Sequence, residues 1–589
     1  MKLICDYKIE TVPHSEYPRP QFRRDSYQCL NGRWRFAVRK AGAPLGNYDK
    51  KINVPFSPET LNSYVEGVDY ITPADRLYYG RDFVIEKIDP EYNTLLHFGA
   101  VDYSCDVYIN GKFAGSHEGG YTAFSIDISP FILVGENSLD VVVCDPTEES
   151  QGGRGKQKTE RGGIWYTAQS GIWQTVWLET VPKIRIEDLT IKTDALKKEV
   201  FIDVAFDGEK NYKVYDGDKL ILSGQTKGQI YLKYDFKLWS PENPKLYDLV
   251  LECGKDKVYS YFGVRSFGVM TDGYGIKRLS LNGKPYFFSG LLDQGYWPDG
   301  LLTPPSDAAV INDLKFVKRM GFNTIRKHIK VESMRWYYHC DKMGIVVWQD
   351  FVNGGGEYKF SHIAVRPFLG IIHKDTDYKY FAREDELGRK RFTAEWQETV
   401  NQLKNCTCIS TWTIFNEGWG QFDSEKIAYA VKITDPTRIV ESVSGWHDYH
   451  NKCDIKSMHT YYTKLKVPRE NRPVTLSEFG GYSYMTPGHV YDEKKFFGYK
   501  KFKSNEKYVS AIKKLYINKV APLIKSGLCA CIYKQLSDVE DELNGLITYD
   551  RKQVKVKPTV MYALNSELYA KFREAILVPI GKKNSGRKT

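Results

Sequence analysis

Two glutamates follow short apolar runs of a kind that forms buried strands. Glu417 lies in TWTIFNEGWGQF (residues 411–422), where a β-branched and aromatic run meets Gly418 and Gly420. Glu478 follows a similar run, RPVTLSEFG. A solvated loop is the usual place for a single glutamate. Two glutamates at two strand ends instead predict a pair of carboxylates that can do chemistry together.

The C-terminal half of the chain must supply the strands that position this pair. From about residue 275, strand-like runs alternate with helical ones, which is the pattern of βα units around a parallel sheet. Eight strands are expected, in YFFSGL, FNTIRKHI, IVVWQDF, CISTWTIFN, TRIVESVSG, DIKSMHTYY, RPVTLSEFG and LCACIYKQL. Eight parallel strands predict a (β/α)₈ barrel, in which the chemistry lies at the C-terminal ends of the strands.

Residues near the ends of these strands form the predicted site around the two glutamates. The candidate substrate-binding residues are Asp293, Arg326, His328, Trp348, Asp350, Asn416, Trp446, His459, Tyr461 and Tyr533. The two tryptophans suit a stacking wall for a sugar ring. Packing remains the alternative for each histidine and tryptophan, and a structural ion pair is the alternative for the arginine.

Two facing carboxylates about 5 to 5.5 Å apart are the equipment of a retaining glycosidase. One attacks the anomeric carbon, and the other protonates the departing oxygen and later activates water, so their pKa values must differ. If Arg326 reaches Glu478, it lowers the pKa of that carboxyl, which makes Glu478 the nucleophile and Glu417 the acid/base. The amide of Asn416 suits the sugar 2-hydroxyl, and the hydroxyl of Tyr461 suits the nucleophile.

The chain before the barrel consists of short alternating runs broken by turn signals, which predict two all-β domains. Residues 1–181 are predicted to form a β-sandwich, in which Asn110 and the next glycine make a hairpin turn. Residues 182–267 have the size of an immunoglobulin-like module. The barrel is predicted over 268–575, followed by a basic tail, 576–589.

Composition narrows the function classes. The 42% hydrophobic and 27% charged residues are ordinary for a soluble globular protein, and the 14% aromatic residues suit sugar stacking or β-structure. The net charge of +11 comes with no nucleic-acid-binding motif, so no nucleic-acid partner is expected. The eleven cysteines include two C-x-C pairs but no zinc-like spacing, so reduced thiols are expected. The absence of a signal-peptide pattern or membrane span predicts a cytoplasmic protein.

These motifs resemble those of glycoside hydrolase family 2, which contains β-galactosidases, β-glucuronidases and β-mannosidases. LNGRWRF, DVYINGKFAGSHEGGYTAFSIDI, SGIWQTVWLE and FGVRSF are similar to family segments before the barrel, and QLSDVEDELNGLITYDR is similar to a segment that closes it. FNEGWGQF resembles the acid/base segment, with Asn416 and Glu417 matching, and TLSEFGG resembles the nucleophile segment, with Glu478 matching. The resemblance implies a jelly-roll-like sandwich, an immunoglobulin-like domain, a (β/α)₈ barrel, and exo-hydrolysis with retention.

Departures from the family pattern concern the substrate. Asp293 and Gln294 stand where β-galactosidases and β-glucuronidases usually carry His-Glu, and RKHIKVE places Lys330 near the pocket rim. The Asn-x-Lys of β-glucuronidases is not evident in DVEDELNGLITYDRKQ. No acid/His pair accompanies Glu417 in the sequence, so neither a metal nor a cofactor is predicted.

A β-galactosidase-like exo-glycosidase acting on an oligosaccharide or small glycoside is the expected function, because galactose is the commonest glycone of the family. A β-glucuronidase or β-glucosidase is the alternative within the family. A catalytically silent carbohydrate-binding protein is the alternative of another class. No membrane partner is expected, and a homo-oligomer remains open.

Overall fold

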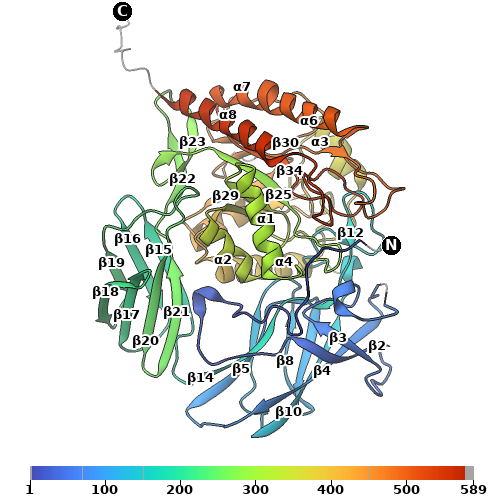
Figure 1. Cartoon of the computed structure of the whole chain (residues 1–589), viewed down its shortest axis with the longest axis vertical. Coiled ribbons are helices and arrows are strands. Elements are labelled where there is room, and N and C mark those ends of the chain that lie inside the picture. The colour runs from blue at the N-terminus through green and yellow to red at the C-terminus, as the bar shows by residue number, and fades with distance from the viewer. Residues whose placement is uncertain (1–2, 69, 150, 450–451, 578–589) are drawn as a thin grey trace, which may run out of the picture.

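The computed structural model of the 589-residue chain describes residues 3–68, 70–149, 151–449 and 452–577. Figure 1 shows three parts: a blue N-terminal sandwich, a green sandwich at its side, and a barrel surrounded by helices. This is the predicted architecture, with a sugar-binding-like sandwich, an immunoglobulin-like domain and a (β/α)₈ barrel. The predicted basic tail lies outside the described residues from residue 578 onward.

The N-terminal sandwich packs two antiparallel sheets on one apolar core. Its larger sheet has the order β3-β2-β4-β10-β7-β8 and is formed by β2 (Gly32–Lys40), β3 (Lys50–Val54), β4 (Asp75–Ile85), β7 (Ser104–Ile109), β8 (Lys112–Glu118) and β10 (Gly135–Cys144). The smaller sheet has the order β1-β14-β5-β9 and is formed by β1 (Tyr27–Cys29), β5 (Tyr92–Phe98), β9 (Phe124–Asp127) and β14 (Val176–Pro182). Buried and less buried residues alternate along β10, as expected when one face covers a core.

The predicted hairpin turn at Asn110 joins β7 to β8. Asn110 and Gly111 have φ values of 51° and 74°, which is the left-handed conformation that such a two-residue turn requires. The prediction is therefore confirmed. Shorter ladders and 3₁₀ turns complete this part of the chain: β6 (Val101–Asp102), β11 (Gln157–Lys158), β12 (Tyr166–Thr167), β13 (Gly171–Ile172), η1 (Pro20–Phe22), η2 (Leu61–Ser63) and η3 (Thr147–Glu149).

The second sandwich encloses its own core of alternating apolar residues, including Val200, Ile202 and Leu249. One sheet has the order β15-β16-β19 and is formed by β15 (Leu189–Asp194), β16 (Glu199–Val204) and β19 (Ile230–Lys233). The other has the order β18-β17-β20-β21 and is formed by β17 (Lys210–Asp216), β18 (Lys219–Thr226), β20 (Tyr247–Cys253) and β21 (Asp256–Phe262). A small sheet then leads into the barrel, with β22 (Phe267–Thr271), β23 (Lys277–Leu281) and β24 (Lys284–Pro285).

All eight predicted barrel strands are present and parallel. The hydrogen-bonded order is β29-β28-β27-β26-β25-β34-β31-β30, and the two end strands, β29 and β30, lie next to each other. The strands are β25 (Phe288–Asp293), β26 (Thr324–Lys327), β27 (Val346–Asp350), β28 (Ile409–Asn416), β29 (Ile439–Ser444), β30 (Lys456–Thr460), β31 (Val474–Gly480) and β34 (Leu528–Lys534). Most are buried along their whole length, because barrel side chains fill one face and helices cover the other.

Helices surround the barrel and begin at recognisable caps. The side chains of Ser306, Asp385 and Ser504 each accept a backbone N–H of the first helical turn that follows. The helices are α1 (Asp307–Arg319), α2 (Met334–Met343), α3 (Arg366–Phe368), α4 (Glu386–Leu403), α5 (Ser424–Thr434), α6 (Asn505–Lys514), α7 (Ala521–Lys525) and α8 (Pro558–Ile576). Two π-helical turns, η4 (Ser361–Val365) and η5 (Leu515–Val520), and the strands β32 (Tyr482–Tyr484) and β33 (Lys500–Phe502) complete this part.

Two further sequence predictions can be compared with the structure. All eleven cysteines lie among the described residues and carry free thiols, as expected. Over the described ranges, no helix combines the length and apolar character that crossing a membrane requires.

Candidate active site

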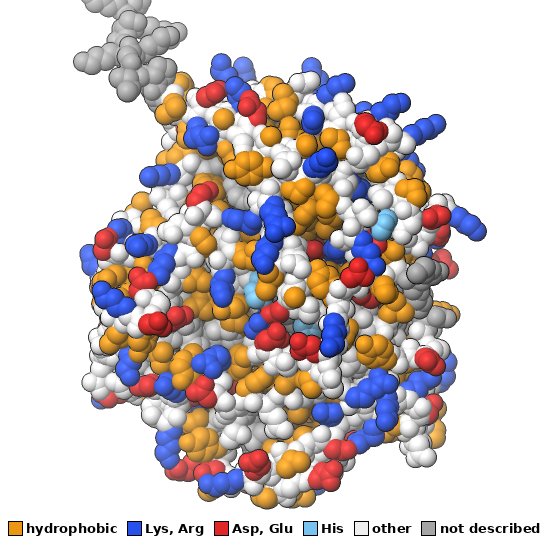
Figure 2. Space-filling model, in the orientation of Figure 1, with side chains coloured by type: hydrophobic (Ala, Val, Ile, Leu, Met, Phe, Trp, Pro, Cys, Tyr) orange, Lys and Arg blue, Asp and Glu red, His pale blue; other side chains and the backbone are white. Residues whose placement is uncertain are grey.

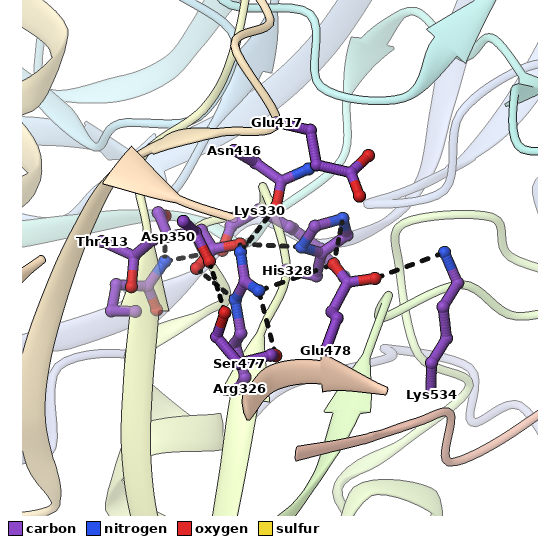
Figure 3. Close-up of polar contacts among 12 residues, drawn as sticks. Arg326, His328, Lys330, Asp350, Thr413, Asn416, Glu417, Ser477, Glu478 and Lys534 are labelled. Carbon is purple, nitrogen blue, oxygen red and sulfur yellow. Dashed lines mark hydrogen bonds and ion pairs between the residues drawn. The ribbon is translucent and has the colours of Figure 1, made fainter. Parts of the chain in front are cut away.

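Arg326, on β26, is the centre of the polar cluster at the C-terminal ends of the barrel strands (Figure 3). Its guanidinium donates twice to Asp350, at 2.9 Å each, and once to Asn416 Oδ1 at 2.8 Å. A third nitrogen lies 3.5 Å from Glu478 Oε1. Although burial lowers the pKa of Arg326, the neighbouring anions Asp350 and Glu478 raise it overall, so the guanidinium stays charged.

Glu478, the predicted nucleophile, is almost completely buried on β31 and surrounded by groups that favour its anion. Tyr461 donates a hydrogen bond to Oε2, and the Lys534 ammonium lies 3.6 Å from the same oxygen. Burial raises the pKa of Glu478, but nearby cations, Lys534 first and Arg326 among them, outweigh it and lower the pKa to about 2. Glu478 is therefore ionised at neutral pH.

Glu417, the predicted acid/base, follows β28 and is held by its backbone and by a histidine. Its φ is 51°, and its N–H donates to the carbonyl of Ser444 at 3.0 Å. Its Oε1 lies 2.7 Å from Nδ1 of His459. Because Arg326 can only donate, its nitrogen 3.3 Å from His459 Nε2 assigns the ring proton to Nδ1. His459 therefore donates to Glu417 Oε1.

The two carboxylates face each other across a short gap. One oxygen of Glu417, one oxygen of Glu478 and one ring nitrogen of His459 all lie within 4.8 Å of one another. That spacing is close to the roughly 5 to 5.5 Å of retaining glycosidases and well below the 6.5 to 9.5 Å of inverting ones, which must fit a water between the groups. The sequence offered no acid/His pair beside Glu417; the structure corrects this, because His459 approaches from β30.

Other predicted residues also come together here. His328 Nδ1 lies 2.7 Å from Asp350, and burial together with the nearby cations Lys156 and Arg326 lowers the pKa of this histidine well below its usual value. The Tyr461 ring stacks on Tyr499 at 3.7 Å between centroids. Trp446 is half-buried, and its ring centroid lies 6.5 Å from that of His459.

Trp348 does not line the site as a stacking wall. Its side chain is fully buried in the core, where its ring centroid lies 6.3 Å from that of Phe288. It is on β27, two residues before Asp350, so both face the barrel interior, with Trp348 one layer further from the strand end. Trp348 therefore packs in the barrel core, which was the alternative to a stacking role.

Asp293 is positioned away from the carboxylates, contrary to its predicted place. It pairs with Lys327 at 2.6 Å, and the same ammonium lies 2.8 Å from Glu332. Lys327 directly follows Arg326 on β26, and successive strand residues point to opposite faces. Asp293 therefore belongs to a buried ion network on the outer side of the barrel strands.

Tyr533 was also predicted in the site, and the structure turns it outward. Its ring packs against Phe479 and Tyr516, with centroids 5.7 and 6.2 Å away. The next residue, Lys534, takes the opposite face of β34 and reaches Glu478. Alternation along LCACIYK allows either residue to face inward, and only the barrel register decides between them.

Two lysines of the site were not identified from the sequence. Lys534 lies between Glu478 and Glu542, 3.2 Å from the latter, and these anions keep its pKa raised despite burial. Lys156 comes from the first sandwich, in a loop that carries no motif. Its ammonium is 5.6 Å from the Trp419 ring and has no hydrogen-bond partner among the described residues. Burial, and secondly Lys534, lower the pKa of Lys156 to about 8.

A solved structure confirms the fold of the chain, and two curated proteins are similar to it in sequence. The β-D-glucuronidase of Dictyoglomus thermophilum superposes with a TM-score of 0.73 at 19% identity, covering 94% of this chain and 98% of that one. A β-glucuronidase from Streptococcus agalactiae is 27% identical over 68% of this chain and 68% of its own length. A β-galactosidase from Leuconostoc mesenteroides is 24% identical over 77% of this chain and 47% of its own length.

The chain spans about half the length of the curated relatives it matches. Three domain models of one family match it in sequence order: the sugar binding domain over residues 45–182, the domain described as "Glycosyl hydrolases family 2" over 184–265, and the TIM barrel domain over 276–562. The third range contains both facing glutamates. From its three matched domains in this order, the chain belongs to glycosyl hydrolases family 2.

Proposed function

We propose that the protein is a retaining exo-β-glycosidase that removes a terminal β-linked sugar by double displacement. The observation that carries the proposal is the facing pair: Glu478 is held as an anion, and Glu417 lies within 4.8 Å of it with a separate hydrogen-bond partner. Two carboxylates at this spacing, in unlike surroundings, can act as nucleophile and acid/base.

In the first step, Glu478 attacks the anomeric carbon from the α face and forms an α-glycosyl ester while the glycosidic bond breaks. Glu417 gives its proton to the departing oxygen. Because Oε1 of Glu417 accepts from His459, the proton belongs on the other oxygen, Oε2. Asn416 accepts from Arg326 through Oδ1, which leaves its buried NH₂ group, unpaired among the described residues, for the sugar 2-hydroxyl.

In the second step, Glu417 removes a proton from water, which attacks the anomeric carbon from the β face. The ester bond to Glu478 breaks, and the sugar leaves with its original configuration. Exo-action is supported by enclosure: the carboxylates are nearly buried, and Trp165 from the sandwich loop lies 5.2 Å from Trp419 of the barrel. Restricted access of this kind favours a chain end over an internal linkage.

The glycone has two candidates. A β-galactoside, the first choice from the sequence, is supported by the β-galactosidases among the relatives. A β-uronide is favoured by Lys156, because a buried ammonium without a partner is costly and a substrate carboxylate would pair with it. β-Glucuronidases among the relatives and the similar folds agree with this second candidate.

A panel of p-nitrophenyl β-glycosides (galactoside, glucuronide, galacturonide, glucoside, mannoside, fucoside) and the α-L-arabinopyranoside tests the proposal. If a uronide is the substrate, Lys156→Met should lower kcat/KM for it by roughly 10- to 100-fold, the worth of a charged hydrogen bond of 1.5–3 kcal/mol. Lys158→Met, two residues further along on β11, is the matched control and should stay near wild type. Hydrolysis of the galactoside alone would exclude the uronide, and silence on the whole panel and on natural oligosaccharides would leave the carbohydrate-binding alternative.

Removing Lys534 should change the pH dependence. Lys534 is the strongest of the charges that lower the pKa of Glu478, so Lys534→Met should raise that pKa and move the acidic limb of kcat/KM to higher pH, by roughly one unit. The measurement is kcat/KM against pH on an aryl glycoside with a good leaving group, so that Glu417 contributes little. An unchanged acidic limb would contradict the electrostatic role of Lys534.

A further inference from the structure

A groove lies on the outside of the barrel beside the strand that follows the nucleophile. Its cavity volume is about 620 Å³. It is bounded by β32, β33, α6 and η5, and it is lined by Tyr482, Lys500, Phe502, Glu506, Lys507, Ser510, Ala511, Lys514, Leu515 and Lys519. We call it the lysine groove.

The lining is strongly cationic. It holds four exposed lysines and a single acid, Glu506. Across the described part of the chain, none of the four ammonium groups forms an ion pair with an acidic side chain. Figure 2 shows blue side chains gathered at the end of the molecule where Figure 1 labels α6 and α7. Like charges held together without counterions favour an anionic occupant.

Two aromatic side chains, the nearly buried Tyr482 and the half-buried Phe502, are among the groove's lining residues. The rings of Tyr482 and Phe502 lie 5.6 Å apart, and the Lys500 ammonium lies within 5.5 Å of both centroids. Aromatic rings stack on the apolar faces of sugars, while ammonium groups pair with carboxylates or sulfates. The combination therefore fits a chain that has sugar rings and repeated negative charges.

The groove is linked to the carboxylate pair through neighbouring segments of the chain. Glu478 is on β31, which continues into β32 after a single residue. Tyr499, just before Lys500, stacks on Tyr461, which donates to Glu478. After Lys500, the chain enters α6, where Lys507 and Lys514 lie seven residues apart. Seven residues make two helical turns, so both lysines lie on one face of α6. Lys519 follows in η5. The cations form a line that leads away from the site.

We infer that the lysine groove binds the body of an acidic polysaccharide, carrying carboxylate or sulfate groups, while the end of that chain occupies the carboxylate pocket. This inference rests on the proposed exo-glycosidase function. An exo-enzyme must accommodate the chain that emerges from its pocket, and the line of ammonium groups provides charge-complementary contacts for it. The groove adds affinity for long substrates without touching the reacting atoms.

The test measures binding without turnover, in Glu478→Gln protein at low salt. The double variant Lys507→Glu/Lys514→Glu is compared with Lys219→Glu/Lys227→Glu, which makes the same charge change on exposed lysines of the second sandwich. The probes are an oligogalacturonate, dextran sulfate, neutral dextran and duplex DNA. Melting temperature checks that each variant is folded.

The groove variant should bind oligogalacturonate or dextran sulfate roughly tenfold or more weakly, with a reduced salt dependence, while the control pair matches the parent. The stronger of the two probes identifies carboxylate or sulfate as the recognised group. Equal losses in both variants, no binding of either polyanion, or DNA bound as tightly as the glycans would each overturn the inference. Because no step of this test needs catalysis, a wild type that is inactive on the glycoside panel and on natural oligosaccharides would overturn the proposed function separately.

Discussion

Replacing Glu478 by alanine should lower kcat for the preferred aryl glycoside by roughly 10⁴-fold or more, the scale seen when a nucleophile is removed. The reason is geometric and electrostatic: Glu478 is the anion at the centre of Arg326, Tyr461 and Lys534. Alanine leaves a gap on the α face in place of the attacking carboxylate. Initial rates on the aryl glycoside measure the effect.

Glu441→Gln is the matched control for this loss. Glu441 is also buried, on the barrel strand β29, and its Oε2 accepts from Thr413. Glutamine keeps that acceptor and removes only a more distant charge from Arg326, so turnover should fall far less than in Glu478→Ala. A Glu478→Ala protein that folds with a wild-type melting temperature and retains substantial turnover would exclude Glu478 as the nucleophile.

Replacing Glu417 by glutamine should have a large effect that depends on the leaving group. The amide cannot give a proton to the departing oxygen, so substrates with poor leaving groups should slow by roughly 10²- to 10⁴-fold. Aryl glycosides with acidic phenols need little protonation and should lose far less in bond cleavage. His459 can still donate to the amide oxygen, so the side chain keeps its position.

The measurement is a series of aryl glycosides of increasing phenol pKa, with kcat/KM plotted against that pKa. Wild type should give a shallow slope, and Glu417→Gln a steep one. Equal losses on good and poor leaving groups would argue that Glu417 positions the substrate and transfers no proton. The series therefore separates acid catalysis from binding.

The fold could be predicted from the sequence because each strand carries its own signal. The apolar runs around Arg326, Asn416 and Glu478 are buried strands of the predicted barrel, and the left-handed turn at Asn110 was readable from its Asn-Gly pair. Once the barrel is assumed, its strand ends must meet at one mouth. That rule brought the two glutamates together, although 60 residues separate them in the sequence.

The wrong site predictions concern residues whose side chains could point either into the barrel or away from it. Asp293 and Tyr533 stand at strand ends, yet the register of β25 and β34 turns them to the outer face. Alternation alone has two solutions, and tertiary packing selects one. Lys156 could not be found, because a loop of another domain brings it to the barrel and no local pattern encodes such a contact.

The configuration of the glycosyl azides formed by two inactive variants tests the assigned roles most directly. With Glu478→Ala, azide replaces the missing nucleophile on the α face, so a β-glycoside should yield the α-glycosyl azide. With Glu417→Ala, azide attacks the ester of Glu478 in place of water and should yield the β-glycosyl azide. NMR of the products distinguishes the two anomers. The reverse assignment, or no azide adduct from either variant on a substrate that wild type hydrolyses, would contradict the double displacement by Glu478 and Glu417.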